Sequence, residues 1–368
     1  MAGKNGLMNP IIAGRLARCR RVMAEKGVPA YLITSHMDSF YLSGFTGEDS
    51  ALLVTPKAVH VISDGRFDET IDHEIPWAKK HLRKGLLTDE IANVCRKLKL
   101  DRVAVQQEGM TVATHAKLRS LTKPVRLTGA PSIALEMRRC KDETELSVMN
   151  RAIRIAEEAF SATRRSIRVG QTEREIAARL EFEMRNRGAD AQAFDTIIAV
   201  DGNASRPHAR AGDRRVKKGS AILFDWGARV GFYHSDLTRV LFVSKIQPRL
   251  GKVYEVVLNA QLAAIQAIRP GERMCDVDAV ARDFIGKAGY GDRFGHGLGH
   301  GLGLDVHEAP SLSWRSKERL TAGMVVTVEP GIYLPGVGGV RIEDDVLVTA
   351  DGCRVLSRLA KDLKGSVL

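Results

Sequence analysis

The segment from Ala221 to Val243, AILFDWGARVGFYHSDLTRVLFV, constrains the fold of this chain more than any other. Two runs rich in β-branched and aromatic residues flank a Gly-containing bend, and each run carries one carboxylate, Asp225 or Asp236. A bend centred between Val230 and Gly231 places the two aspartates opposite each other on one face of a hairpin, about 5 Å apart. Continuous apolar runs outside both aspartates are typical of buried strands.

Two buried carboxylates at this distance both stay ionised only if a cation lies between them. The pattern therefore predicts a metal site. The alternative is a hairpin with both acids facing solvent, where water screens their repulsion.

The 368 residues, 44% hydrophobic and 27% charged, are typical of a soluble globular chain with two domains. Strands and helices alternate up to about residue 140, which predicts an α/β domain over residues 1–140. A charge run at 141–145 then opens a long helix, and the rest predicts an α+β domain of helices on an antiparallel-rich sheet over residues 141–368. The predicted helices span residues 10–27, 89–98, 142–167, 172–187, 249–268 and 274–288, and the predicted strands outside the opening hairpin span 30–34, 51–55, 58–63, 102–106, 196–200, 324–329 and 340–348.

Composition also limits location and partners. The apolar runs are too short for a bilayer, and the N-terminus lacks the features of a signal peptide, so we expect no membrane association. The five cysteines are odd in number and form no C-x-x-C, which favours a reducing, cytoplasmic compartment. The net charge of +12 raises nucleic acid as a partner, but the basic residues lie on predicted helices without interleaved aromatic residues. We interpret them as a solvated surface and do not expect nucleic-acid binding.

Three more candidate metal ligands follow the hairpin. His300 lies in FGHGLGHGLGLDVHE, whose glycines prevent a stable helix and let backbone approach a ligand closely. Glu329 ends the apolar run MVVTVE, and Glu343 follows GGVRI, so the two flank a Gly-rich turn and are expected to oppose each other. One imidazole and four carboxylates suit Mn²⁺, Co²⁺, Fe²⁺ or Zn²⁺. Four carboxylates are too many for one ordinary divalent ion, so we predict two metals about 3.5–4 Å apart and hydrolysis of a polarised carbonyl.

Three residues are candidates to support that chemistry. His208, in NASRPHAR, and His307, in DVHE, are placed to hold a substrate or to donate hydrogen bonds to a developing oxyanion. Arg341 precedes Glu343 by two residues, so it shares the same strand face and is expected to orient the acidic cluster. His234 and His296 we interpret as structural or as supporting residues.

These motifs together resemble a known family. DWGARVGFYHSDLTR, HGLGHGLGLDVHEAP, VEPGIYLPG and VRIEDD closely resemble the pita-bread-fold dinuclear metallopeptidases, in particular Xaa-Pro aminopeptidases and Xaa-Pro dipeptidases (prolidases). The N-terminal part, with DSFYLSGF and SDGRF, resembles that family's creatinase-like α/β domain, and residues from about 142 to 360 resemble its pita-bread catalytic domain.

The resemblance implies a role for each candidate and a set of partners. It implies that two divalent ions (Mn, Co or Zn) are bound, that Asp236 and Glu343 bridge them, and that Glu329 also accepts a proton from the attacking hydroxide. His208 and His307 are similar to residues that contact substrate, and Arg341 to one that lines the active site. The implied metal ligands are Asp225, Asp236, His300, Glu329 and Glu343. An Xaa-Pro peptide or dipeptide as substrate and a homodimer are implied as partners.

Three alternatives to an Xaa-Pro peptidase remain. A methionine aminopeptidase shares the fold, but such relatives lack so long an N-terminal domain. A creatinase-type amidinohydrolase resembles both domains, but that activity does not use the five-ligand set. The third is a non-catalytic pita-bread module that binds peptide, protein or nucleic acid.

Overall fold

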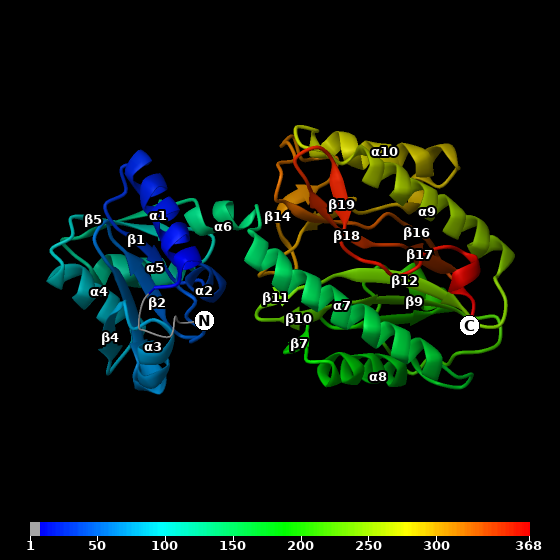
Figure 1. Cartoon of the computed structure of the whole chain (residues 1–368), viewed down its shortest axis with the longest axis horizontal. Coiled ribbons are helices and arrows are strands. Elements are labelled where there is room, and N and C mark those ends of the chain that lie inside the picture. Colours follow the sequence, from blue (N-terminus) through cyan, green and yellow to red (C-terminus); the bar gives the residue numbers. More distant parts are fainter. Residues whose placement is uncertain (1–7) are drawn as a thin grey trace. The chain divides into compact units, whose positions relative to one another are not determined.

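The computed structural model describes residues 8–368, and the chain forms two compact units that divide between Arg138 and Arg139 (Figure 1). All six helices predicted from the sequence are present, with ends within two residues of those expected. None of the helices in residues 8–368 combines the length and the hydropathy that a bilayer crossing requires.

The first unit is built on a six-stranded sheet in the order β4-β3-β2-β1-β5-β6. The pairs β1–β2 and β2–β3 are antiparallel, and the other neighbouring strands are parallel. Helices connect the parallel strands, as expected for an α/β unit. Its strands are β1 (Tyr31–Ile33), β2 (Ala51–Val54), β3 (Val59–Asp64), β4 (Lys79–Arg83), β5 (Arg102–Gln106) and β6 (Arg126–Ala130). Its helices are α1 (Pro10–Glu25), α2 (His36–Ser43), α3 (Asp68–Glu74), α4 (Leu87–Lys97), α5 (Val112–Leu121) and α6 (Ile133–Arg138).

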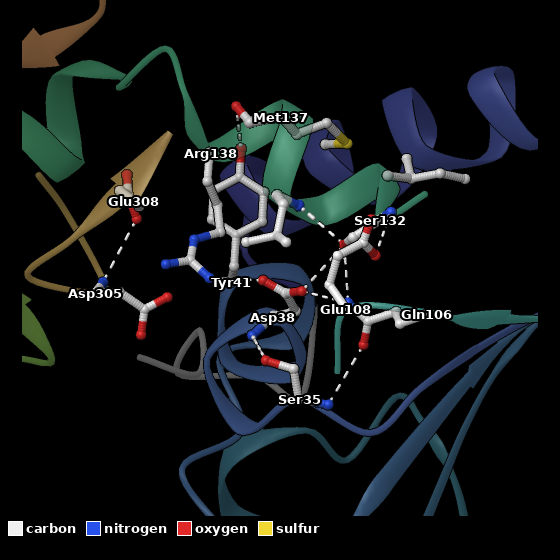
Figure 2. Close-up of polar contacts among 12 residues, drawn as sticks. Ser35, Asp38, Tyr41, Gln106, Glu108, Ser132, Met137, Arg138, Asp305 and Glu308 are labelled. Atoms are coloured by element: carbon white, nitrogen blue, oxygen red, sulfur yellow. Dashed lines mark hydrogen bonds and ion pairs between the residues drawn. The ribbon is translucent and has the colours of Figure 1, made fainter. Parts of the chain in front are cut away.

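A buried polar network joins α2, β5 and α6 in this unit (Figure 2). Asp38 is 1% exposed and accepts hydrogen bonds from Arg138 Nη1 at 2.7 Å and from Ser132 Oγ at 3.2 Å. Gln106 Nε2 donates to the same carboxylate and to Ser132 Oγ at 2.8 Å. Because a buried carboxylate is tolerated only when it is paired, these contacts fix α2 and α6 on the sheet.

The second unit packs two pairs of helices on strands that lie between them (Figure 1). Its helices are α7 (Glu143–Ser166), α8 (Glu173–Asn186), α9 (Pro248–Ala267) and α10 (Met274–Lys287). Its strands are β7 (Ala191–Gln192), β8 (Ile197–Val200), β9 (Ala221–Trp226), β10 (Ala228–Val230), β11 (Tyr233–His234), β12 (Leu237–Phe242), β13 (Gly299–Gly301), β14 (Glu308–Leu312), β15 (Val325–Val328), β16 (Gly331–Leu334), β17 (Gly338–Arg341), β18 (Asp344–Val348) and β19 (Cys353–Val355). The sheets that carry the central hairpin and the C-terminal strands have the orders β12-β9-β8 and β14-β13-β15-β18-β19. All the pairs within them are antiparallel, as the α+β prediction required.

The strand β9 is buried on both faces, which explains its continuous apolar sequence. Ile222 and Phe224 belong to the core beneath α7 and α8, whereas Ala221 and Leu223 belong to the core beneath α9 and α10. Since side chains alternate along a strand, Asp225 points to the same side as Ala221 and Leu223.

The turn of the central hairpin lies one residue later than predicted. Gly231 and Phe232 form it, with φ values of 52° and 68°, as a primed two-residue turn requires. Asp225 consequently pairs with Thr238 rather than with Asp236, so the predicted direct opposition of the two aspartates is wrong. Asp225 and Asp236 still lie on the same face of the hairpin, because a shift of two residues along a strand leaves the direction of each side chain unchanged.

Candidate active site

The two aspartates of the hairpin lie diagonally across β9 and the start of β12. Asp225 is 9% exposed and Asp236 is 4% exposed. Each offers a carboxylate oxygen, and Glu343 a third, such that these three atoms all lie within 4.8 Å of one another. The hairpin therefore brings two acids into one buried cluster despite the corrected register.

His300 enters the cluster from β13, where the flanking glycines allow close strand packing. A Cβ at Gly299 would lie 1.9 Å from the Thr327 carbonyl oxygen, so only glycine fits there. His300 Nδ1 lies 3.1 Å from the Gly301 carbonyl oxygen, which can only accept, so Nδ1 carries the proton. Nε2 is then the atom that faces the carboxylates, 3.3 Å from Glu329 and 3.7 Å from Asp236.

Glu329 and Glu343 lie opposite each other, between the antiparallel strand pairs β15–β18 and β16–β17. Val328 pairs with Asp344 on one side and Gly331 with Arg341 on the other, which leaves Glu329 opposite Glu343 as the sequence predicted. The predicted strand 340–348 is interrupted at this point, since Glu343 forms an isolated bridge with Thr238 between β17 and β18.

Hydroxyl groups hold both glutamates. Thr238 Oγ1 donates to Glu343 Oε2 at 2.6 Å, and Thr327 Oγ1 donates to Glu329 Oε1 at 3.2 Å. Neither threonine was predicted from the sequence as a site residue. With the hairpin turn placed at Gly231, Thr238 would have been recognised as the partner of Asp225.

Arg341 lies inside the cluster, 3% exposed. Its guanidinium forms an ion pair with Asp225, donates to Thr238 Oγ1 at 3.1 Å and donates to the Tyr333 hydroxyl at 2.9 Å. The Tyr333 oxygen lies 2.8 Å from His296 Nε2. Tyr333 was not predicted as a site residue, because nothing in its sequence spacing distinguishes it.

The two histidines proposed as substrate contacts line the same cleft as the cluster. This cleft has a volume of about 1470 Å³ and includes His208, His307, Trp314 and Arg174 in its walls. His208 and His307 are exposed. The ring centroid of His307 lies 4.2 Å from that of His300, edge to face, which places His307 beside the acidic cluster.

Burial raises the pKa values of three acids in the cluster, so these acids ionise together only beside a positive charge. Burial raises the pKa of Asp236 well above its usual range, and the neighbouring Glu343 and Asp225 raise it further. Burial, with Glu329 and Asp225, does the same to the pKa of Glu343. Burial also raises the pKa of Asp225, although Arg341 opposes the rise. At Glu329 burial is outweighed by the bond from His300 and by the charges of His300, His296 and Arg341, which together hold the pKa at about 2.

The donor set fits divalent ions. Asp225, Asp236 and Glu343 form one group of potential ligand atoms, and His300, Glu329 and Glu343 form a second. Oxygen and imidazole donors in this number suit Mn²⁺, Co²⁺ or Zn²⁺. Ions at these positions would supply the charge that lets the buried acids ionise together.

Comparison with known proteins agrees with the fold and the chemistry. The description "Metallopeptidase family M24" matches residues 147–350, and "Creatinase/Prolidase N-terminal domain" matches residues 15–140. An uncharacterized peptidase of Bacillus subtilis, YqhT, is 36% identical over 95% of this chain and 99% of its own length. A solved Xaa-Pro dipeptidase from Bacillus anthracis is 34% identical with a TM-score of 0.93, covering 97% of this chain and all of that one.

A solved X-Pro aminopeptidase from Thermotoga maritima is 36% identical with a TM-score of 0.89, covering 95% of this chain and all of that one. The pita-bread architecture predicted from the motifs, with its creatinase-like first domain, is thereby confirmed. The chain belongs to metallopeptidase family M24 and is a metal-dependent peptidase with a creatinase/prolidase N-terminal domain.

Proposed function

We propose that this peptidase hydrolyses the bond between an N-terminal residue and proline, in Xaa-Pro dipeptides or in longer Xaa-Pro peptides. The observation that carries the proposal is the convergence of four carboxylates and one imidazole in a cleft of about 1470 Å³. Solved relatives that are called an Xaa-Pro dipeptidase and an X-Pro aminopeptidase support the choice of substrate.

Two divalent ions, of manganese, cobalt or zinc, would be held by Asp225, Asp236, His300, Glu329 and Glu343. Potential ligand atoms form three groups, and Glu343 belongs to two of them. Asp236 also belongs to two, one with Asp225 and Glu343 and the other with His300 and His307. This sharing supports a bridging role for Asp236 and Glu343. When bound, such ions polarise a carbonyl oxygen and lower the pKa of water to near neutrality.

The other residues then divide the remaining tasks. Glu329, whose carboxylate lies among the ligand atoms, would also accept a proton from the attacking water. His208 and His307 are exposed in the cleft and would donate hydrogen bonds to the substrate carbonyl as it becomes an oxyanion. Arg341 would hold Asp225 in place through their ion pair.

The preference for proline follows from the chemistry of its amide. An Xaa-Pro bond has no N–H, and proline restricts the residue before it to extended conformations. Peptidases that grip an extended backbone through this N–H lose a contact at such bonds. A site that recognises the free amine and polarises the carbonyl does not need it.

The test is to remove metal with a chelator and to assay Xaa-Pro dipeptides and longer Xaa-Pro peptides with Mn²⁺, Co²⁺ or Zn²⁺ restored singly. We expect cleavage only with metal present. The ratio of dipeptide to longer-peptide turnover assigns the enzyme to one of the two activities. Creatine turnover and peptide binding without cleavage are measured in parallel. If no metal restores cleavage of any Xaa-Pro substrate, the proposal fails.

We further propose that the protein acts in the cytoplasm as a homodimer. Its five free cysteines suit a reducing compartment, and the dimer is proposed from family resemblance. Sedimentation equilibrium and cell fractionation test these two points.

A further inference from the structure

Arg239 lies directly behind the bridge that carries Glu343 into the acidic cluster. Asp236, directly before β12, and Thr238, on β12, point towards the cluster, and Arg239 points to the opposite side of the strand. Arg239 is nevertheless 2% exposed, so its charge is buried and needs partners.

The guanidinium of Arg239 forms hydrogen bonds to both strands that meet at this bridge, at Thr238 and at Glu343. Nη1 donates to the Glu343 carbonyl oxygen at 2.6 Å and to the Thr238 carbonyl oxygen at 2.9 Å. Nη2 donates to Asp344 Oδ1 at 2.7 Å and to the Leu359 carbonyl oxygen at 3.0 Å. One side chain therefore ties together β12, the start of β18 and a segment near the end of the chain.

Asp344 is the second centre of this network and is 1% exposed. Its carboxylate also accepts hydrogen bonds from Ser357 Oγ at 2.7 Å and from Gln261 Nε2 at 2.9 Å, and it forms an ion pair with Lys361. Both oxygens are thus fully engaged, by α9 on one side and by residues 357–361 on the other.

The position of this network beside Glu343 gives it a role in the active site. Consecutive residues of an extended chain point to opposite faces, so fixing the Asp344 side chain also fixes the direction of Glu343. Groups that orient metal ligands from behind change metal affinity by about 10- to 100-fold when they are removed. Arg239 contacts the Glu343 carbonyl oxygen directly and also holds the next residue, Asp344. The network is therefore placed to orient Glu343 from behind.

We propose that Arg239, Asp344 and Lys361 are positioning residues that hold Glu343 in the geometry needed for metal binding, so that residues 357–361 contribute to the affinity of the metal centre. This inference rests on the proposed function only in taking Glu343 as a metal ligand.

The variant to test is Lys361→Met. The Lys361 side chain is 21% exposed, so its replacement is compatible with folding, whereas Arg239 is buried. Lys361→Arg is the conservative rescue, since it restores a cation beside Asp344. Arg164→Met is the matched control. Arg164 holds the same end of the chain through the carbonyl oxygens of Gly365 and Val367, at 2.7 and 2.9 Å, without touching the network.

Metal-free proteins are titrated with Mn²⁺ by calorimetry, and their Tm values are measured without metal. We expect Lys361→Met to bind Mn²⁺ about 10-fold more weakly or worse, Lys361→Arg to bind it within about threefold of the parent, and Arg164→Met to lose Tm while keeping the parent affinity. Equal affinity in Lys361→Met and the parent overturns the inference, as does equal weakening in Arg164→Met. Failure of the parent to bind Mn²⁺ would instead contradict the proposed function.

Discussion

Asp236 is the residue on which the proposed centre depends most. It shares one group of ligand atoms with Asp225 and Glu343 and another with His300 and His307. We predict that Asp236→Ala lowers Mn²⁺ affinity by about 100-fold or more and abolishes peptide cleavage, because the loss of a direct ligand exceeds that of a supporting group. The metal-free Tm is not expected to fall, since the change removes one of several repelling acids.

Calorimetric titration and a peptidase assay check this prediction. Asp276→Ala is the control, because Asp276 is an exposed acid on α10 paired with Arg273. A variant at Asp236 that cleaves at the parent rate would contradict the bridging role.

Site residues whose side-chain type contrasts with their sequence neighbours were predictable from the sequence. Residues that reach the site only through strand pairing were not. Asp225, Asp236, His300, Glu329 and Glu343 stand out because acids interrupt apolar strands and a histidine lies among glycines. Thr238, Thr327 and Tyr333 have no such contrast, since threonine and tyrosine are ordinary strand residues. Only the register between strands distant in sequence brings their hydroxyl groups to the cluster.

At the scale of elements, β13 depends on its glycines to bring His300 to the acids. We predict that Gly299→Ala destabilises the protein by about 1–3 kcal/mol, because the new Cβ would meet the Thr327 carbonyl oxygen and force β13 from β15. The same displacement should weaken metal binding. Urea unfolding and Mn²⁺ titration measure the two effects.

Gly286→Ala provides the comparison for that substitution. Gly286 lies on α10, and a methyl group added there would have no neighbouring atom within 4 Å, so alanine should be neutral or stabilise the helix by up to about 1 kcal/mol. If both substitutions have the same effect, steric crowding at β13 is not the cause.

The pair of β3 and β4 contains two histidines that predict a pH dependence. His60 Nδ1 lies 2.9 Å from His81 Nε2. Burial, with the nearby His81 and Lys79, lowers the pKa of His60 from 6.5 to about 4, and burial also lowers the pKa of His81. Between these pH values the unfolded chain binds more protons than the folded one, so stability falls as pH drops from about 7 to 4.

Hydrogen exchange of β3 and β4 as a function of pH measures this effect. His60→Gln should flatten the dependence in these strands and leave that of β9 and β12 unchanged. Protection that is constant over this pH range in the parent protein would show that the histidines do not titrate as described.

The elements themselves were largely predictable, and their exact register was not. The charge run at 141–145 predicted the start of α7, and capping residues predicted that of α8. In the structure both N-termini carry capping boxes, at Asp142 and Thr172. The turn at Gly231 and Phe232 was misplaced by one residue, because a phenylalanine with positive φ is rare and gives no signal. Helices α2, α3, α5 and α6 were missed. Of these, α2 and α6 are short and rest on the buried contacts of Asp38 and Arg138.

At the scale of the whole molecule, metal binding and stability are linked. Ions that bind the folded centre stabilise it by about 2.7 kcal/mol at 100 times Kd, which corresponds to a rise in Tm of about 5–10 °C for a unit of this size. We predict this rise when Mn²⁺ is added to chelated protein, as measured by calorimetry. Asp236→Ala should show little of it. A Tm that does not respond to metal would contradict the assignment of the acidic cluster.

Some of the residues that line the cleft come from different parts of the chain than the acidic cluster. The acids and the histidine of the cluster lie on or beside strands, whereas Arg174 belongs to α8, and His208 and Trp314 belong to connecting segments. Substitutions in such segments are tolerated far better than substitutions in buried strands. Substrate preference can therefore diverge among descendants of this chain while the hydrolytic chemistry is inherited unchanged.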